Sequence, residues 1–280
     1  MGATSGPSLA GDLHLYPFGR TDRATVVAQQ YEDLLETTES EDIRCLTRLC
    51  SERDLADAII DTLDSVAYPT VSSLSTVAIE TLQAFTPGIT QLSDHERIEL
   101  LAAFLDDYEW ESDYLATAAE QESFQQDVGE LLIEMESRDR LDPAMYESPV
   151  LTEIATVGNA FQTELTTKEY VDRPSLIPRA TAELEKTPDE DLPQSVTQSE
   201  AILVADFEEL AEMERQFLAA LADAVGAEIT AVAERDSRLL SSWREAGSVE
   251  SLASGLHTIP HTVEQESLSA PDVVGEYLAT

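Results

Sequence analysis

An unbroken apolar run that leads directly into acidic residues is the feature that most constrains this chain. Residues Ala201–Ala205 contain no polar side chain, and the segment Asp206-Phe207-Glu208-Glu209-Leu210 follows at once. Such a run is typical of a short strand that is buried on both faces of a parallel sheet. A second apolar run, Ile229–Ala233, comes after a helical stretch. Two buried strands joined by a helix predict an α/β domain with a parallel sheet.

Shorter segments near the N-terminus extend this pattern. Residues 13–16, 43–47 and 70–72 have the length and composition of strands, and stretches with helical spacing of apolar residues follow them. From Ser93 the pattern becomes entirely helical, and Ser93 and Glu96 form a capping box that opens it.

The sequence therefore predicts a sheet domain interrupted by a helical insertion. The N-terminal residues are rich in Gly, Ser and Ala and are expected to be disordered. The predicted divisions are residues 1–11 as a disordered N-terminus, 12–90 plus 196–250 as the α/β domain, 91–195 as the helical insertion, and 251–280 as a C-terminal tail.

The chain is strongly acidic, with 56 Asp and Glu against 16 Lys and Arg and a formal net charge of -40. Disorder would require low hydrophobicity as well as charge, whereas 42% of this chain is hydrophobic. At about 1 M salt the Debye length is roughly 3 Å, so repulsion between surface charges is largely screened. Only Lys168 and Lys186 are lysines. The composition predicts a folded, halophilic protein of the cytoplasm.

Several functional classes receive no support. No stretch approaches the roughly 18 uncharged apolar residues of a membrane span, and no signal-peptide pattern is visible at the N-terminus. Cys45 and Cys50 are expected to be buried thiols rather than a disulfide or metal pair. Pro260 lies within the H-x-x-x-H spacing of His257 and His261, which disfavours a helical metal pair. No membrane partner and no metal site are predicted.

The order of these segments resembles the first motor domain of the UvrD/Rep-type superfamily 1 helicases, including the AddB-like subunits of helicase–nuclease complexes. In that family one strand ends in D-E-F-Q-D, which Ala205–Glu209 resembles, and the next leads into a segment similar to Ala233–Ala246. The resemblance covers about residues 12–250 and rests on order, spacing and hydrophobic pattern more than on identities. It implies a RecA-like, P-loop NTPase-like sheet whose large helical insertion lies where the family places its helical subdomain.

Two further segments resemble the family segments that contact single-stranded DNA. Leu46-Thr47-Arg48 is similar to T-F-T-x-x-A-A, and Pro69–Ala78 is similar to a segment near T-F/L-H-S-F-A. The resemblance implies Thr47, Ser73 and Arg244 as contacts to single-stranded DNA. Ordinary strand-end hydroxyls and plain packing of the Trp243-Arg244 pair are the alternatives. No basic stripe is visible in the sequence.

The phosphate-binding chemistry of the family is eroded. ATP hydrolysis needs a glycine-rich loop, a lysine on the phosphates and a hydroxyl on Mg²⁺. In the matching stretch, Thr25 takes the hydroxyl position, Ala24 the lysine position and Arg23 the glycine before it. A second register, with Gly19-Arg20-Thr21 at G-K-T, would start the following helix too late.

The acidic motif is altered as well. Ala205 stands at the position of the magnesium-holding Asp, Asp206 at that of the catalytic Glu, and Ser237 or a neighbour at that of the phosphate-sensing Gln. Thr25, Asp206 and Glu209 thus mark a degenerate nucleotide site. We predict no catalytic residue and no binding of ATP or Mg²⁺. The alternative for Asp206, Glu208 and Glu209 is a solvated helix N-terminus, where acids interact favourably with the helix dipole.

We therefore expect a catalytically inactive, helicase-like protein that acts by interaction. It would be a scaffold, a regulatory subunit or a truncated relic linked to DNA repair and recombination, with a helicase or nuclease subunit or single-stranded DNA as partner. Two other hypotheses stay open: a helical protein–protein interaction module unrelated to helicases, and an enzyme of unrecognised class. A parallel sheet with strands near the predicted positions would separate the first hypothesis from the second.

Overall fold

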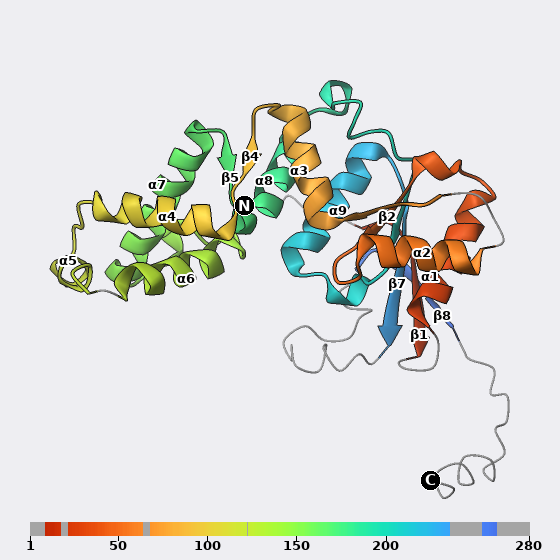
Figure 1. Ribbon diagram of the computed structural model, residues 1–280, viewed down its shortest axis with the longest axis horizontal. Helices are drawn as coiled ribbons and strands as arrows, with labels where there is room; N and C mark the ends of the chain where they lie inside the picture. The colour runs from red at the N-terminus through yellow and green to blue at the C-terminus, as the bar shows by residue number, and fades with distance from the viewer. Residues whose placement is uncertain (1–8, 18–21, 64–67, 122, 236–253, 262–280) are drawn as a thin grey trace, which may run out of the picture.

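A six-stranded sheet forms the centre of one half of the molecule (Figure 1). The computed structural model describes residues 9–17, 22–63, 68–121, 123–235 and 254–261. The strand order is β3-β2-β6-β7-β1-β8, and every pairing in this sheet is parallel. The strands are β1 (Gly11–Pro17), β2 (Ile43–Thr47), β3 (Thr70–Ser73), β6 (Ala201–Val204), β7 (Ile229–Arg235) and β8 (Leu256–Pro260).

The prediction of an α/β chain with a parallel sheet is confirmed. Each of the five predicted strands is present within two residues of its predicted bounds. The apolar run at Ala201–Val204 is buried throughout and lies between β2 and β7, as its uninterrupted hydrophobicity requires.

Helices cover both faces of the sheet. Side chains alternate along each strand, so that Leu13 and Leu15 face one layer whereas Tyr16 faces the other. The first layer contains α3 (Leu74–Phe85), α8 (Arg173–Lys186) and α9 (Glu212–Val225). The second contains α1 (Arg23–Leu35) and α2 (Glu52–Thr62). The sheet is therefore the middle layer of three.

Short polar side chains define where several helices begin. Ser51 accepts a hydrogen bond from the backbone of Asp54 at the start of α2, and Ser73 accepts one from Thr76 at the start of α3. Ser93 and Glu96 form the predicted capping box at α4. Such caps satisfy backbone N–H groups that the first helical turn leaves unpaired.

A second, mainly helical unit lies on the far side of α3 and α8 from the sheet (Figure 1). Its hydrophobic core extends from Leu92 to Tyr170. The chain enters this unit through β4 (Thr90–Gln91) and leaves it through β5 (Tyr170–Val171), and the two strands pair in parallel. Its helices are α4 (Asp94–Asp106), α5 (Asp113–Ala118), α6 (Phe124–Glu136) and α7 (Pro149–Thr167).

The structure places three boundaries differently from the sequence prediction. Helix α8 lies within the predicted insertion, yet its Leu176 and Leu184 pack in the same core as the sheet. Strand β8 lies within the predicted C-terminal tail but pairs with β1. At the other end, Leu9 is buried and Gly11 already belongs to β1, so order begins before residue 12.

Gly11 explains one of these differences. Its φ is +127°, and a Cβ there would lie 2.1 Å from the carbonyl oxygen of Ile229. The glycine signals a close approach of β1 to β7, although composition alone made it look like part of a flexible terminus. Within the described residues, no helix is both long and apolar enough to span a bilayer.

Candidate functional site

The carboxyl edge of the sheet carries a compact cluster of charged side chains. Parallel strands end at the same edge, which is where α/β proteins bind ligands. Tyr16 lies on β1, Glu208 follows β6, Glu234 lies on β7, and Arg23 is the first residue of α1. The Arg23 Nη2 lies 2.6 Å from the Glu208 Oε1, and its Nε donates to the Tyr16 hydroxyl at 2.9 Å. The Glu234 Oε2 lies 3.9 Å from the same Nη2.

Burial dominates the electrostatics of this cluster. The Glu208 side chain is fully buried, and burial raises the pKa of its carboxyl to about 7, against the opposing effect of Arg23. Burial also raises the pKa of Tyr16 and of Glu209. The second oxygen of Glu208, Oε2, has no hydrogen-bond partner among the described residues. Arg23 is therefore the main group that stabilises the charged form of Glu208.

Asp206 has a structural role that the sequence did not indicate. It is fully buried, and its Oδ1 accepts a hydrogen bond from the backbone N–H of Arg48 at 2.9 Å. Its Oδ2 accepts from the backbone N–H of Leu49 at 2.8 Å and from the Thr47 hydroxyl at 3.1 Å. The carboxylate thus holds the turn that follows β2 against the end of β6.

The alternative of a solvated helix N-terminus is wrong for these acids. The segment Phe207–Glu209 forms a single 3-10 turn, and α9 begins only at Glu212. Asp206 and Glu208 are buried, and Glu209 is half-buried. Asp206 accepts from backbone N–H groups and Glu208 is paired with Arg23, so these two acids have partners within the protein.

Thr25 lies apart from these acids. It is exposed in the first turn of α1, and its hydroxyl donates to Asp22 at 3.5 Å. Sequence reasoning assigned the hydroxyl and missed Arg23, which does reach the acidic residues. The signal that could have identified it is an arginine at the start of the helix after β1 combined with an acid just after β6.

The arrangement gives the edge cluster little capacity to hold phosphate. A P-loop lysine reaches phosphates from the start of the helix after the first strand. Ala24 takes that position in the sequence, and its neighbour Arg23 is the first residue of α1. Its guanidinium is already engaged by Glu208 and Tyr16. Four carboxyl groups surround it within the described residues, on Asp206, Glu208, Glu209 and Glu234. A polyphosphate would meet an excess of like charge.

The predicted DNA-contact residues have local partners where the structure describes them. Thr47 is buried and donates to Asp206, and it accepts from the backbone of Cys50 at 3.1 Å. Ser73 is the N-cap of α3. These are the contacts of strand-end hydroxyls. Trp243 and Arg244 lie outside the described residues, as does Ser237.

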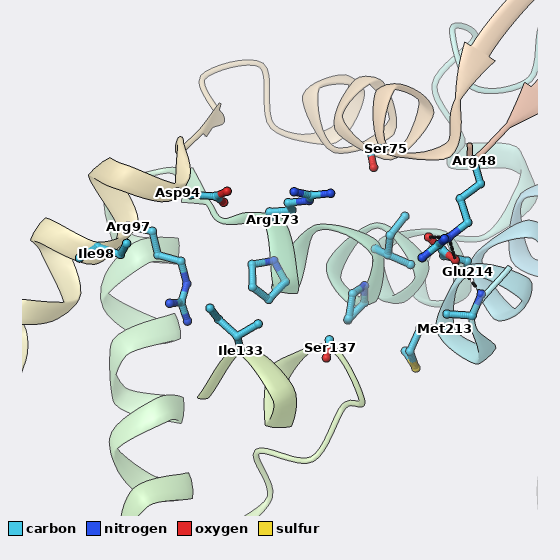
Figure 2. A pocket seen from close by; sticks show the side chains of 14 residues that line it. Arg48, Ser75, Asp94, Arg97, Ile98, Ile133, Ser137, Arg173, Met213 and Glu214 are labelled. Atoms are coloured by element: carbon cyan, nitrogen blue, oxygen red, sulfur yellow. Dashed lines mark hydrogen bonds and ion pairs between the residues drawn. The ribbon is translucent and has the colours of Figure 1, made fainter. Parts of the chain in front are cut away.

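A groove of about 430 Å³ lies between the sheet unit and the helical unit (Figure 2). Arg48 reaches into it after β2, and its Nε lies 2.8 Å from the Glu214 Oε2 on α9. The residues that line the groove come from α3, α4, α6, α8 and α9 and from adjoining loops: Arg48, Ser75, Asp94, Arg97, Ile98, Ile133, Ser137, Arg173, Pro174, Ile177, Pro178, Ala211, Met213 and Glu214.

A buried ionic network stands behind one wall of the groove. The Arg97 Nε lies 2.6 Å from the Asp172 Oδ2, and its Nη2 lies 2.9 Å from the Glu136 Oε2. Asp172 also caps α8 by accepting from the backbone of Ser175. Burial raises the pKa of Glu136 to about 7, and Asp172 raises it further while Arg97 lowers it. The network ties α4 and α6 to the start of α8.

The described part of the chain contains no group of three or more His, Cys, Asp or Glu side chains arranged to hold a metal ion. Cys45 is buried and Cys50 half-buried, and both are free thiols. His261 lies 2.9 Å from His14, between their Nε2 and Nδ1 atoms.

Comparison of the chain with protein-family models and with curated proteins finds no match in either case. The resemblance to helicase motor domains therefore stays a prediction from the sequence.

Proposed function

We propose that this chain is a helicase-like protein without ATPase activity, which acts through interaction as a scaffold or regulatory subunit in DNA repair or recombination. The observation that carries the proposal is the ion pair between Arg23 and Glu208. The pair fills the edge of the sheet where a motor domain of this type would hold the phosphates of ATP. Glu208, a residue of the chain itself, supplies the negative charge that Arg23 faces there.

The sheet order supports the RecA-like part of the proposal. The three strands that resemble the helicase segments, β1, β7 and β6, lie side by side in that order. Their carboxyl ends bring the α1 N-terminus and the acidic segment after β6 together, although 185 residues separate Arg23 from Glu208. The presence of this sheet disfavours an interaction module built from helices alone.

The chemistry supports the inactive part of the proposal. Phosphoryl transfer is catalysed mainly by positive charge and positioned donors around the transferring group. Arg23 is committed to Glu208 and Tyr16, and Asp206 is committed to the turn after β2. Both side chains are thus engaged in structural contacts.

The test has two parts, both in 3 M KCl because of the charge of -40. Turnover of radiolabelled ATP is measured with and without single-stranded DNA, and we expect no hydrolysis above the protein-free blank. Tagged protein is then co-expressed with a UvrD/Rep-type motor subunit or with a nuclease subunit of a helicase–nuclease complex, and we expect the two to co-purify. DNA-stimulated turnover would contradict the inactive assignment, and failure to co-purify would contradict the scaffold role.

A further inference from the structure

Two isoleucines that line the groove, Ile98 and Ile133, have exposed side chains although they lie on amphipathic helices. Ile98 follows the apolar spacing of α4, which predicts a core position alongside Leu101 and Leu105. Those two leucines are buried, but Ile98 is 60% exposed. Ile133 on α6 is 42% exposed and lines the same groove (Figure 2). Exposed aliphatic residues that share one concavity indicate a surface that another molecule covers.

The groove also gathers cations in a chain that has few of them. Three of the 16 basic residues line it. Arg97 is neutralised by Asp172 and Glu136 behind the wall. Arg173 is exposed and has no ion-pair partner among the residues that the structure describes. A free guanidinium beside exposed aliphatic side chains favours an anionic occupant that also carries apolar groups.

Arg48 can change partners at low cost to the fold. It is paired with Glu214, which also lines the groove. Glu214 also accepts a hydrogen bond from the backbone N–H of Ala211 at 2.7 Å, which caps α9. If an incoming carboxylate engaged Arg48, Glu214 would keep this capping bond. The pair is therefore suited to exchange with a ligand.

We propose that the groove binds an acidic segment of a partner protein that bears aliphatic side chains. The inference rests on the proposed function in that the chain acts by interaction, and it identifies where that interaction takes place. The aliphatic residues Ile98, Ile133 and Ile177 would receive the partner's apolar side chains. Arg173 and Arg48 would bind its carboxylates.

Single-stranded nucleic acid fits the groove less well. Its sequence-tolerant binding uses aromatic platforms on which bases stack, whereas the lining contains no aromatic side chain. In molar salt the phosphate contribution weakens steeply, but burial of aliphatic surface persists.

The experiment uses the full chain in 2 M KCl and a bead library of 12-residue peptides made of Asp, Glu, Leu, Ile and Ser. Peptides that the wild-type chain selects are labelled, and their affinity is measured by fluorescence anisotropy. We expect the double variant Ile98→Asp/Ile133→Asp to weaken binding by about tenfold or more, because it places unpaired carboxylates against apolar groups. Arg173→Glu should weaken binding at 0.5 M KCl more than at 3 M.

Matched controls separate the groove from general surface effects. Met145 is 60% exposed, as Ile98 is, and lies outside the groove. Arg53 is an exposed arginine on α2. Met145→Asp and Arg53→Glu should leave the affinity unchanged, and circular dichroism confirms that every variant is folded.

Three outcomes would overturn the proposal. In the first, no peptide is selected; in the second, the selected peptides bind the groove variants as tightly as they bind wild type. In the third, a labelled oligothymidylate binds instead of the peptides, and the groove variants weaken its binding. ATP turnover distinguishes the two proposals. A chain that hydrolyses ATP and binds peptide in the groove contradicts only the proposed function. A chain without turnover that selects no peptide contradicts only the groove assignment.

Discussion

Arg23 and Glu208 are 185 residues apart in the chain, and their side chains meet at 2.6 Å where the strands of the sheet end. Glu208 is fully buried there, and Arg23 is its closest cation. A buried carboxylate in this position is stable only when a partner offsets the loss of its hydration. The pair thus explains both the burial of an acidic segment and the absence of a free cation for phosphate at this edge of the described structure.

Removal of Arg23 should destabilise the fold. Arg23→Ala leaves Glu208 buried without its cation, which costs about 3 kcal/mol or more in unfolding free energy. Adding Glu208→Gln should recover part of this loss because a neutral amide tolerates burial better than an unpaired charge. Urea denaturation in 3 M KCl measures both.

The control for this change is Arg53→Ala, which removes the exposed i,i+4 pair with Asp57 and should cost no more than about 0.5 kcal/mol. Equal losses for Arg23→Ala and Arg53→Ala would show that the buried pair has no special role.

Stability should fall as pH rises from about 4.5 to 7. Burial raises the folded-state pKa of Glu208 and of Glu136 to about 7, from an ordinary value of 4.5. In this window the folded state holds more protons than the unfolded state, so the unfolding free energy decreases with pH. Each proton contributes up to about 1.4 kcal/mol per pH unit.

The two carboxyls can be tested separately because they lie in different units. Glu208→Gln and Glu136→Gln should each remove about half of the pH dependence of the unfolding free energy that the two carboxyls cause together. Urea denaturation between pH 5 and 8 measures this dependence. A slope that neither variant changes would assign the pH dependence to other groups.

Asp206 should matter for stability rather than for catalysis. Asp206→Ala removes the acceptor for two backbone N–H groups and the Thr47 hydroxyl, which should cost about 2–4 kcal/mol because buried donors are left unpaired. Thr47→Val removes one hydroxyl of the same group and should cost about 1 kcal/mol. Thermal unfolding followed by circular dichroism should rank the losses in this order; the reverse order would contradict the structural role of Asp206.

Salt should stabilise the chain through screening. Raising KCl from 0.2 to 3 M shortens the Debye length to a few ångströms and reduces repulsion among the charges that give a net charge of -40. We expect the melting temperature to rise steadily with KCl. Sucrose at matched water activity is the control, and an equal rise in sucrose would indicate that charge screening is not the cause.

The strands could be predicted because their residues carry a local signal. Ala201–Val204 is apolar throughout, and strands of this kind belong in the middle of a parallel sheet. Strand β8 carries no comparable signal, because Leu256–Pro260 lies at the sheet edge with polar residues between its apolar ones. Its place depends on pairing with β1, which is far away in sequence.

The site was less predictable than the fold for the same reason. Asp206 and Glu208 look like surface acids in a chain with 56 acidic residues, and only the folded structure brings Arg23 to them. Ile98 shows the opposite failure, because its spacing predicts burial and the structure leaves it exposed. Local pattern identifies which residues are apolar, but which of them the chain itself covers depends on tertiary packing.

The most direct test of the central claim is ATP turnover by the full-length chain in 3 M KCl with a single-stranded DNA oligonucleotide. We predict that phosphate release stays at the protein-free blank for wild type and for Arg23→Lys, which places a lysine at the first residue of α1. Hydrolysis that DNA stimulates, and that Asp206→Asn abolishes while the protein stays folded, would contradict the account.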